Sequence, residues 1–279
     1  MPDAKNESII RKIFYFFLIS HGLPFLVTAI LMLLEKSFFI STPGFGTVLY
    51  LGMLSPTIAA IFIVYYFCDQ TQRKDYWKSV IDFRRIKWQW VVIIITFPIL
   101  LRLLAAIFAP LFTTSGFDFN LSSNMTIPYA LMLFFFGPLP EELGWRGVAL
   151  PLLNKKWGFS AAVLFLGFMW SIWHLPLFFV EGTYQYQLGL GSGLFWNYMV
   201  AVLFTSVVYG FIYFGTNRSI LAVILFHYFG NLSGELFEMN FSAEIISTIL
   251  RGIIALILLI YISKNQWIVN RVETNSPKS

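Results

Sequence analysis

Eight long apolar runs are the feature of this sequence that most restricts its fold. Each is close to the ~20 residues that a helix needs to cross the hydrocarbon core of a bilayer. The 279 residues are 58% hydrophobic and 12% charged, with a mean hydropathy of +0.73, outside the range of soluble domains. The sequence predicts an all-α, polytopic membrane protein with about eight transmembrane helices. The runs cover residues 13–34, 47–67, 89–113, 127–150, 160–180, 194–214, 219–237 and 244–263.

The distribution of Lys and Arg predicts the orientation, because positive residues near the ends of spans are held on the cytoplasmic side. With the N-terminus inside, fifteen of the nineteen Lys and Arg residues fall in inner segments and Lys36 alone falls in an outer loop. The other three, Arg102, Arg146 and Arg251, lie in or beside apolar runs. Both termini are therefore predicted to be cytoplasmic. The same asymmetry accounts for the net charge of +5, so we expect contact with the lipid bilayer and not with nucleic acid.

The organisation of the chain is simple. No shift in composition marks a second domain, so residues 1–279 are predicted to form a single membrane domain, integral and multi-pass, in the cell membrane if the host is prokaryotic. Cys68 is the one cysteine, which excludes an intrachain disulfide and a cysteine-rich metal site. Gly230 and Gly234 have the spacing of a close helix contact, which favours packing within the chain over a dimer interface.

Two adjacent glutamates, Glu141 and Glu142, lie in GPLPEELGWRG at the end of the fourth run. An ionised carboxylate at such a position costs about 3 kcal/mol, so it indicates a functional site. On a helix the two side chains point about 100° apart. Glu142 and Arg146 have the i, i+4 spacing of an ion pair, which leaves Glu141 for chemistry. The alternative is that the whole cluster is a structural ion-pair network.

Two histidines and an asparagine on later runs could join Glu141. His227 and Asn231 are i and i+4, so they project from one helix face. At ~1.5 Å per residue, Glu141 lies ~14 Å, His227 ~12 Å and His174 ~21 Å from the inner ends of their runs. Glu141 and His227 could therefore meet, whereas tilt or an extended helix must bring His174 to them. Taken alone, a histidine among aromatic residues such as His174 is more often a core residue than a catalyst.

This set of residues suits peptide hydrolysis. Glu141 would be the general base and His174 would orient the water, while His227 and Asn231 would offer N–H donors to the oxyanion. There is no HExxH motif, although Glu141, His174 and His227 could hold zinc with an open fourth position. We slightly favour a metal-free reaction, because Asn231, one turn from His227, suits a second oxyanion donor better than a metal ligand.

The chain resembles the CPBP family of intramembrane proteases, which includes the CAAX prenyl endopeptidases and bacteriocin-processing (Abi) proteins. The family pattern is EExxxR, FxxxH and HxxxN on successive membrane segments. Here the three motifs read EELGWR at 141–146, WSIWH at 170–174 and HYFGN at 227–231. Trp170 stands at the phenylalanine position of the second motif, which keeps an aromatic ring but changes its shape.

The resemblance covers about residues 127–237, which we take as the catalytic core. It implies an eight-helix membrane fold and endoproteolysis of a lipidated or membrane-associated peptide. It also implies that Glu141 and His174 activate water and that His227 and Asn231 form the oxyanion hole, with Glu142 and Arg146 in support. The alternatives are a non-catalytic membrane protein of immunity or scaffold type that retains the fold, and a proton or ion pathway that uses the same buried groups.

Overall fold

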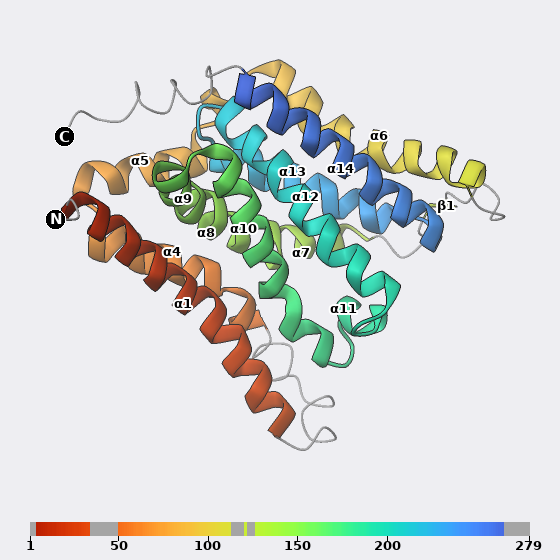
Figure 1. Cartoon of the computed structure of the whole chain (residues 1–279), viewed down its shortest axis with the longest axis horizontal. Helices are drawn as coiled ribbons and strands as arrows, with labels where there is room; N and C mark the ends of the chain where they lie inside the picture. Colours follow the sequence, from red (N-terminus) through yellow and green to blue (C-terminus); the bar gives the residue numbers. More distant parts are fainter. Residues whose placement is uncertain (1–3, 34–49, 113–119, 122–125, 265–279) are drawn as a thin grey trace.

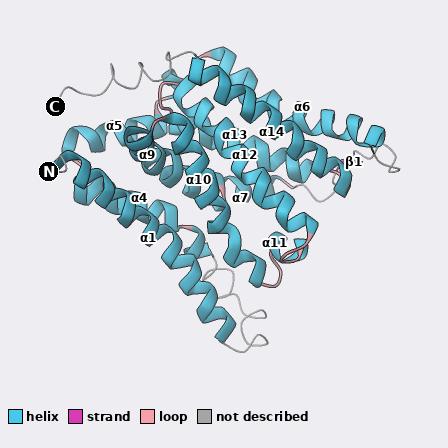
Figure 2. Cartoon of the chain, in the orientation of Figure 1, coloured by secondary structure: helices cyan, strands magenta, loops and turns pink. Residues whose placement is uncertain are grey.

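The computed structural model describes residues 4–33, 50–112, 120–121 and 126–264. This part of the chain is almost entirely helical (Figure 2), which confirms the all-α prediction. One short antiparallel ladder pairs β1 (Asn120–Leu121) with β2 (Phe237–Glu238). The α-helices are α1 (Ala4–Leu33), α4 (Ser55–Phe67), α5 (Gln70–Ile81), α6 (Trp88–Phe112), α7 (Ile127–Phe136), α8 (Pro138–Gly144), α9 (Leu150–Trp157), α10 (Phe159–His174), α11 (Tyr184–Leu188), α12 (Gly193–Gly215), α13 (Ile220–Leu236) and α14 (Phe241–Lys264). Two 3₁₀ segments, η1 (Phe83–Arg85) and η3 (Leu175–Phe179), and one π-helix, η2 (Trp145–Ala149), complete the list.

Five helical segments of the described chain are long and apolar enough to cross a membrane, so the protein is an integral, multi-pass membrane protein. They are Glu7–Leu33, Trp88–Phe112, Phe159–Phe179, Gly193–Gly215 and Phe241–Lys264. Two further apolar helices, α4 and α13, are shorter, and the fourth predicted span is divided into α7, α8, η2 and α9. Eight crossings therefore stay a prediction. The terminal tails and the loop that contains Lys36 lie outside the described residues, so the cytoplasmic orientation also stays a prediction.

Hydroxyl side chains set the beginnings of several helices. Thr126, Ser192 and Ser219 each accept a hydrogen bond from the backbone N–H three residues later, at the starts of α7, α12 and α13. Such N-caps satisfy donors that would otherwise lack a partner at a helix start. Polar residues at the ends of the apolar runs thus determine where the membrane helices begin.

The helices form two groups around a central layer (Figure 1). On one side α1 packs along α4, and on the other side α6, α12, α13 and α14 pack together. Between these groups lie α8, α9 and α10, with α8 against α4 and α13, and α10 against α12. Large apolar side chains remain exposed on the outer helices, as on Leu33 of α1, Leu111 of α6 and Leu256 of α14, which is the surface expected against lipid.

The close contact between α8 and α4 depends on Gly144. A Cβ atom at this position would lie 2.5 Å from the carbonyl oxygen of Pro56 on α4. Nearby, the Thr57 hydroxyl donates to the Pro140 carbonyl at 2.6 Å, and the Tyr76 hydroxyl donates to the Leu143 carbonyl at 3.0 Å. Side chains of α4 and α5 therefore bond directly to backbone carbonyl groups of α8, which ties the three helices together.

We expect Gly144→Ala to destabilise the protein, because the added methyl group must push α4 and α8 apart. The melting temperature in detergent should fall by several degrees, since forcing extra volume into a packed interior typically costs roughly 1–3 kcal/mol. Gly22→Ala on α1 is the matched control, because no atom lies within 4 Å of its added Cβ. An equal melting temperature for both variants would contradict the role of Gly144.

Candidate active site

A large cavity brings the predicted catalytic residues together. Its volume is about 750 Å³, and it is lined by residues of α6, α7, α8, α10, α11, α12, α13 and α14 among others. Glu141 of α8, His174 of α10, and His227 and Asn231 of α13 all line it. The mismatch in depth expected for His174 is absent, because His174 is the last residue of α10 and borders the same cavity as Glu141.

Glu141 is held by Trp170. The indole Nε1–H of Trp170 donates a hydrogen bond of 2.6 Å to Glu141 Oε2. The other carboxylate oxygen, Oε1, borders the space in front of Gly137, where α7 ends and α8 begins. A Cβ atom at Gly137 would lie 3.8 Å from Glu141 Oε1 and 3.4 Å from Asn231 Nδ2. The missing side chain of Gly137 thus leaves one open space between the carboxylate and the amide.

Glu142 lies on the other side of α8, with 0% of its surface exposed. Its Oε1 atom accepts a hydrogen bond of 3.0 Å from Arg146 Nη1 and one of 2.9 Å from His227 Nδ1. The ion pair with Arg146 was expected from the spacing, whereas the bond to His227 was not. Glu142 therefore links the EELGWR motif to the HYFGN motif directly.

Arg146 is enclosed by two aromatic rings. Its guanidinium carbon lies 4.6 Å from the ring centroid of Trp170 and 4.7 Å from that of Tyr209, so each ring face meets the cation. Arg146 belongs to the π-helix η2, and such π-bulges are frequent at functional sites. The buried charge therefore has both a carboxylate partner and aromatic partners, and it fixes the two rings relative to Glu142.

The hydrogen bonds of the two histidines determine their tautomers. His174 Nδ1 lies 2.8 Å from the Trp170 carbonyl oxygen. A carbonyl accepts only, so Nδ1 carries the proton and Nε2 is left as an acceptor in the neutral ring. His227 Nδ1 likewise donates to the Glu142 carboxylate. In both rings, Nε2 is the atom left for the cavity.

The donor arrangement does not fit a metal ion. Among the residues that the structure describes, no three His, Cys, Asp or Glu side chains come together as a possible ligand group. Glu141, His174 and His227 share the cavity but are not grouped around one point, and Glu141 is bonded to an indole N–H. The sequence was compatible with a zinc site at Glu141, His174 and His227. The positions of these side chains do not form one, so no step of the reaction is assigned to zinc.

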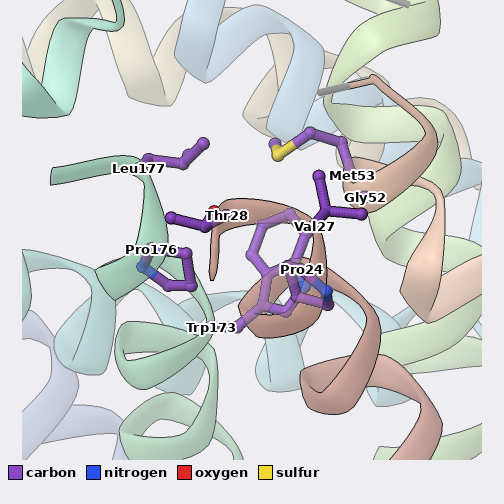
Figure 3. Close-up of a pocket in the computed structure, with 8 residues that line it drawn as sticks. All are labelled: Pro24, Val27, Thr28, Gly52, Met53, Trp173, Pro176 and Leu177. Carbon is purple, nitrogen blue, oxygen red and sulfur yellow. The ribbon is translucent and has the colours of Figure 1, made fainter. Parts of the chain in front are cut away.

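A second, much smaller cavity lies between α1 and the end of α10 (Figure 3). Trp173, Pro24 and Pro176 face one another across it, together with Met53. Its volume is about 10 Å³, and its lining is mainly apolar. That space is at the lower limit for one water molecule, so it is a packing defect and not a binding site.

Several residues of the large cavity were missed as site residues by the sequence analysis. They are Tyr198 and Tyr209 of α12, Arg102 of α6, Glu244 and Arg251 of α14, and Glu235 of α13. Arg102 and Arg251 had a visible signal, because each is a charge within an apolar run and such charges usually face a cavity. The tyrosines had none, since an aromatic residue in a membrane helix is most often part of the packing.

We expect Glu142→Gln to lower the free energy of unfolding by about 3 kcal/mol, because removing one partner of a buried ion pair leaves the other charge unpaired. The measurement is thermal unfolding of the purified protein in detergent. Glu141→Gln, the same change one residue earlier, is the matched control, because the Glu141 carboxylate accepts its hydrogen bond from the neutral Trp170. Similar losses of stability in the two variants would show that the two carboxylates do not differ in structural role.

Comparison with known proteins agrees with this site. The model of the type II CAAX prenyl endopeptidase Rce1-like family matches residues 123–233, which include all three motifs and nearly coincide with the core predicted at 127–237. A Methanococcus maripaludis protein named CAAX prenyl protease 2 is 27% identical over 220 residues, which cover 76% of this chain and 80% of that protein. Both findings confirm the resemblance to the CPBP family of intramembrane proteases that the three motifs indicate.

Proposed function

We propose that this protein is a CAAX-type membrane endopeptidase, which hydrolyses a peptide bond near the C-terminus of a lipidated protein. The observation that carries the proposal is the meeting of Glu141, His174, His227 and Asn231 in one cavity of about 750 Å³. These residues come from α8, α10 and α13, and each presents a hydrogen-bonding group to a cavity that also has apolar walls. Polar groups that converge within a partly apolar cavity are the usual form of a small-ligand site.

In the proposed reaction, Glu141 is the general base. A water molecule between Glu141 Oε1 and His174 Nε2 gives a proton to the carboxylate and attacks the carbonyl carbon of the scissile bond. The C–N bond then breaks, and Glu141 returns the proton to the leaving amine. Trp170 holds the carboxylate by its 2.6 Å hydrogen bond to the other oxygen, so Oε1 is the atom directed to the water.

The oxyanion would be stabilised by the Asn231 amide and by His227. Because the Nδ1–H of His227 donates to Glu142, Nε2 carries a hydrogen only when the ring is an imidazolium. The carboxylate of Glu142, 2.9 Å from His227 Nδ1, fixes the orientation of the ring. We therefore assign Glu142 as a positioning residue, since it orients a group that would contact the reacting atoms.

The substrate class follows from the comparisons and from the cavity. The related Methanococcus maripaludis protein is named for CAAX prenyl proteolysis, and the matched family model carries the same description. The cavity adds an apolar lining that would suit an isoprenoid chain, from Phe97, Leu133, Phe136 and Leu194. We propose that the lipid of the substrate lies against this lining and that residues 127–237 form the catalytic core of a single membrane domain.

The test is cleavage of a prenylated reporter peptide by the purified protein in detergent. Glu141→Gln should reduce the rate by at least roughly 10²-fold, because it removes the base and keeps the shape of the side chain. Full activity of this variant would contradict the mechanism. Activity that is lost with a zinc chelator and restored by zinc would also overturn it, and proton flux in liposomes without cleavage would favour an ion pathway instead.

Trp170 provides a second test, specific to this chain. Trp170→Phe restores the residue of the family pattern but removes the donor to Glu141, so kcat should fall roughly tenfold, as for one hydrogen bond to a charged group. Trp173→Phe is the matched control, because its indole donates to Ser55 at 3.0 Å and not to Glu141. Equal kcat values for the two variants would show that the indole bond does not position the base.

A further inference from the structure

Arg251 gives the cavity a positive charge that forms no ion pair within the residues that the structure describes. It lies in the middle of α14, in the apolar segment STILRGIIAL, and lines the cavity. Within the described part of the chain, its guanidinium makes no hydrogen bond and no ion pair, although it interacts electrostatically with Glu244 and with Arg102. A charged side chain inside a membrane helix usually has a partner, so an unpaired one facing a cavity indicates a missing anion.

The other charged groups at this end of the cavity have hydrogen-bond partners of their own. Arg102 Nη2 lies 3.0 Å from Glu244 Oε1 and 2.7 Å from the carbonyl oxygen of Phe237. Glu235 Oε2 accepts a hydrogen bond of 3.0 Å from the Tyr129 hydroxyl. The ion pair of Glu244 is therefore with Arg102, and Arg251 is the cation available to a ligand.

The position of Arg251 relative to the catalytic residues follows from the helices. α13 and α14 are joined by a short connection, and each packs against both α6 and α12. At ~1.5 Å per residue, His227 lies ~14 Å and Arg251 ~15 Å from that shared connection, so they are at the same level. Tyr209 of α12 interacts electrostatically with both Glu141 and Arg251, so both charges lie near this one tyrosine.

We propose that Arg251 binds the C-terminal carboxylate of the substrate. This inference rests on the proposed function, because a CAAX substrate ends the chain only three residues beyond its lipidated cysteine. Three extended residues span at most about 10 Å, so the new amine at the scissile bond and the terminal carboxylate lie within one cavity of this size. A guanidinium matches a carboxylate with two parallel hydrogen bonds, which selects a chain end over an internal peptide segment.

The experiment compares two prenylated reporter peptides of identical sequence, one with a free C-terminal carboxylate and one with a C-terminal amide. The wild-type protein should cleave the carboxylate form with a kcat/KM roughly 10- to 100-fold higher, as for loss of hydrogen bonds to a charged group. Arg251→Gln should remove this preference by slowing cleavage of the carboxylate form alone. Arg251→Lys keeps the charge but not the two parallel hydrogen-bond donors of the guanidinium, so this variant should retain part of the preference for the carboxylate form.

Arg84→Gln is the control, because Arg84 carries the same charge at an exposed site outside the cavity. This variant should prefer the carboxylate peptide as strongly as the wild-type protein does. If the wild-type protein cleaves both peptides at equal rates, or Arg251→Gln slows both alike, the carboxylate site is wrong while the proposed function stands. If neither peptide is cleaved, the proposed function itself fails. If Arg251→Gln changes only the response to phosphatidylglycerol in vesicles, Arg251 binds a lipid phosphate and the inference is overturned.

Discussion

The buried carboxylate of Glu142 is the interaction on which the site depends. It receives Arg146 from its own helical segment and His227 from α13, so one oxygen atom connects two parts of the chain that are 85 residues apart. Taking these charges out of water is costly, and the cost is offset only where each charge has well-placed partners. The two rings of Trp170 and Tyr209 on either side of Arg146 supply part of that environment.

The same network explains why Glu141 and Glu142 differ although they are adjacent. Helical geometry turns Glu142 toward Arg146 and α13, and turns Glu141 toward the cavity and Trp170. The carboxylate of Glu141 is available to a ligand, whereas Oε1 of Glu142 is occupied by Arg146 and His227. In the low-dielectric interior of a membrane protein, electrostatic interactions of this kind are stronger than in water, so fixed charges and dipoles there can stabilise a developing oxyanion effectively.

Local spacing was enough to predict much of this site. The i, i+4 pairs, Glu142 with Arg146 and His227 with Asn231, depend only on helical geometry, and their positions along the chain follow from the apolar runs. The helical nature of the runs was predictable for the same reason. The prolines Pro138 and Pro140 indicate a break in the helix just before the acidic pair, and α7 does end at Gly137; both prolines lie within the first turn of α8, where proline is tolerated.

Contacts between segments that are distant along the chain could not be predicted from the sequence. The indole bond from Trp170 to Glu141 depends on the rotation of α10 against α8, and residue counting alone did not bring His174 to the level of Glu141. Within the described residues, the pairing of Arg102 with Glu244 leaves Arg251 without an ion pair, which can be seen only once α6 and α14 are packed together. A charge in an apolar run indicates that some partner exists, but the packed helices show which charges satisfy each other. Arg251, which has no such partner among the described residues, is therefore the group that we propose contacts an anionic part of a ligand.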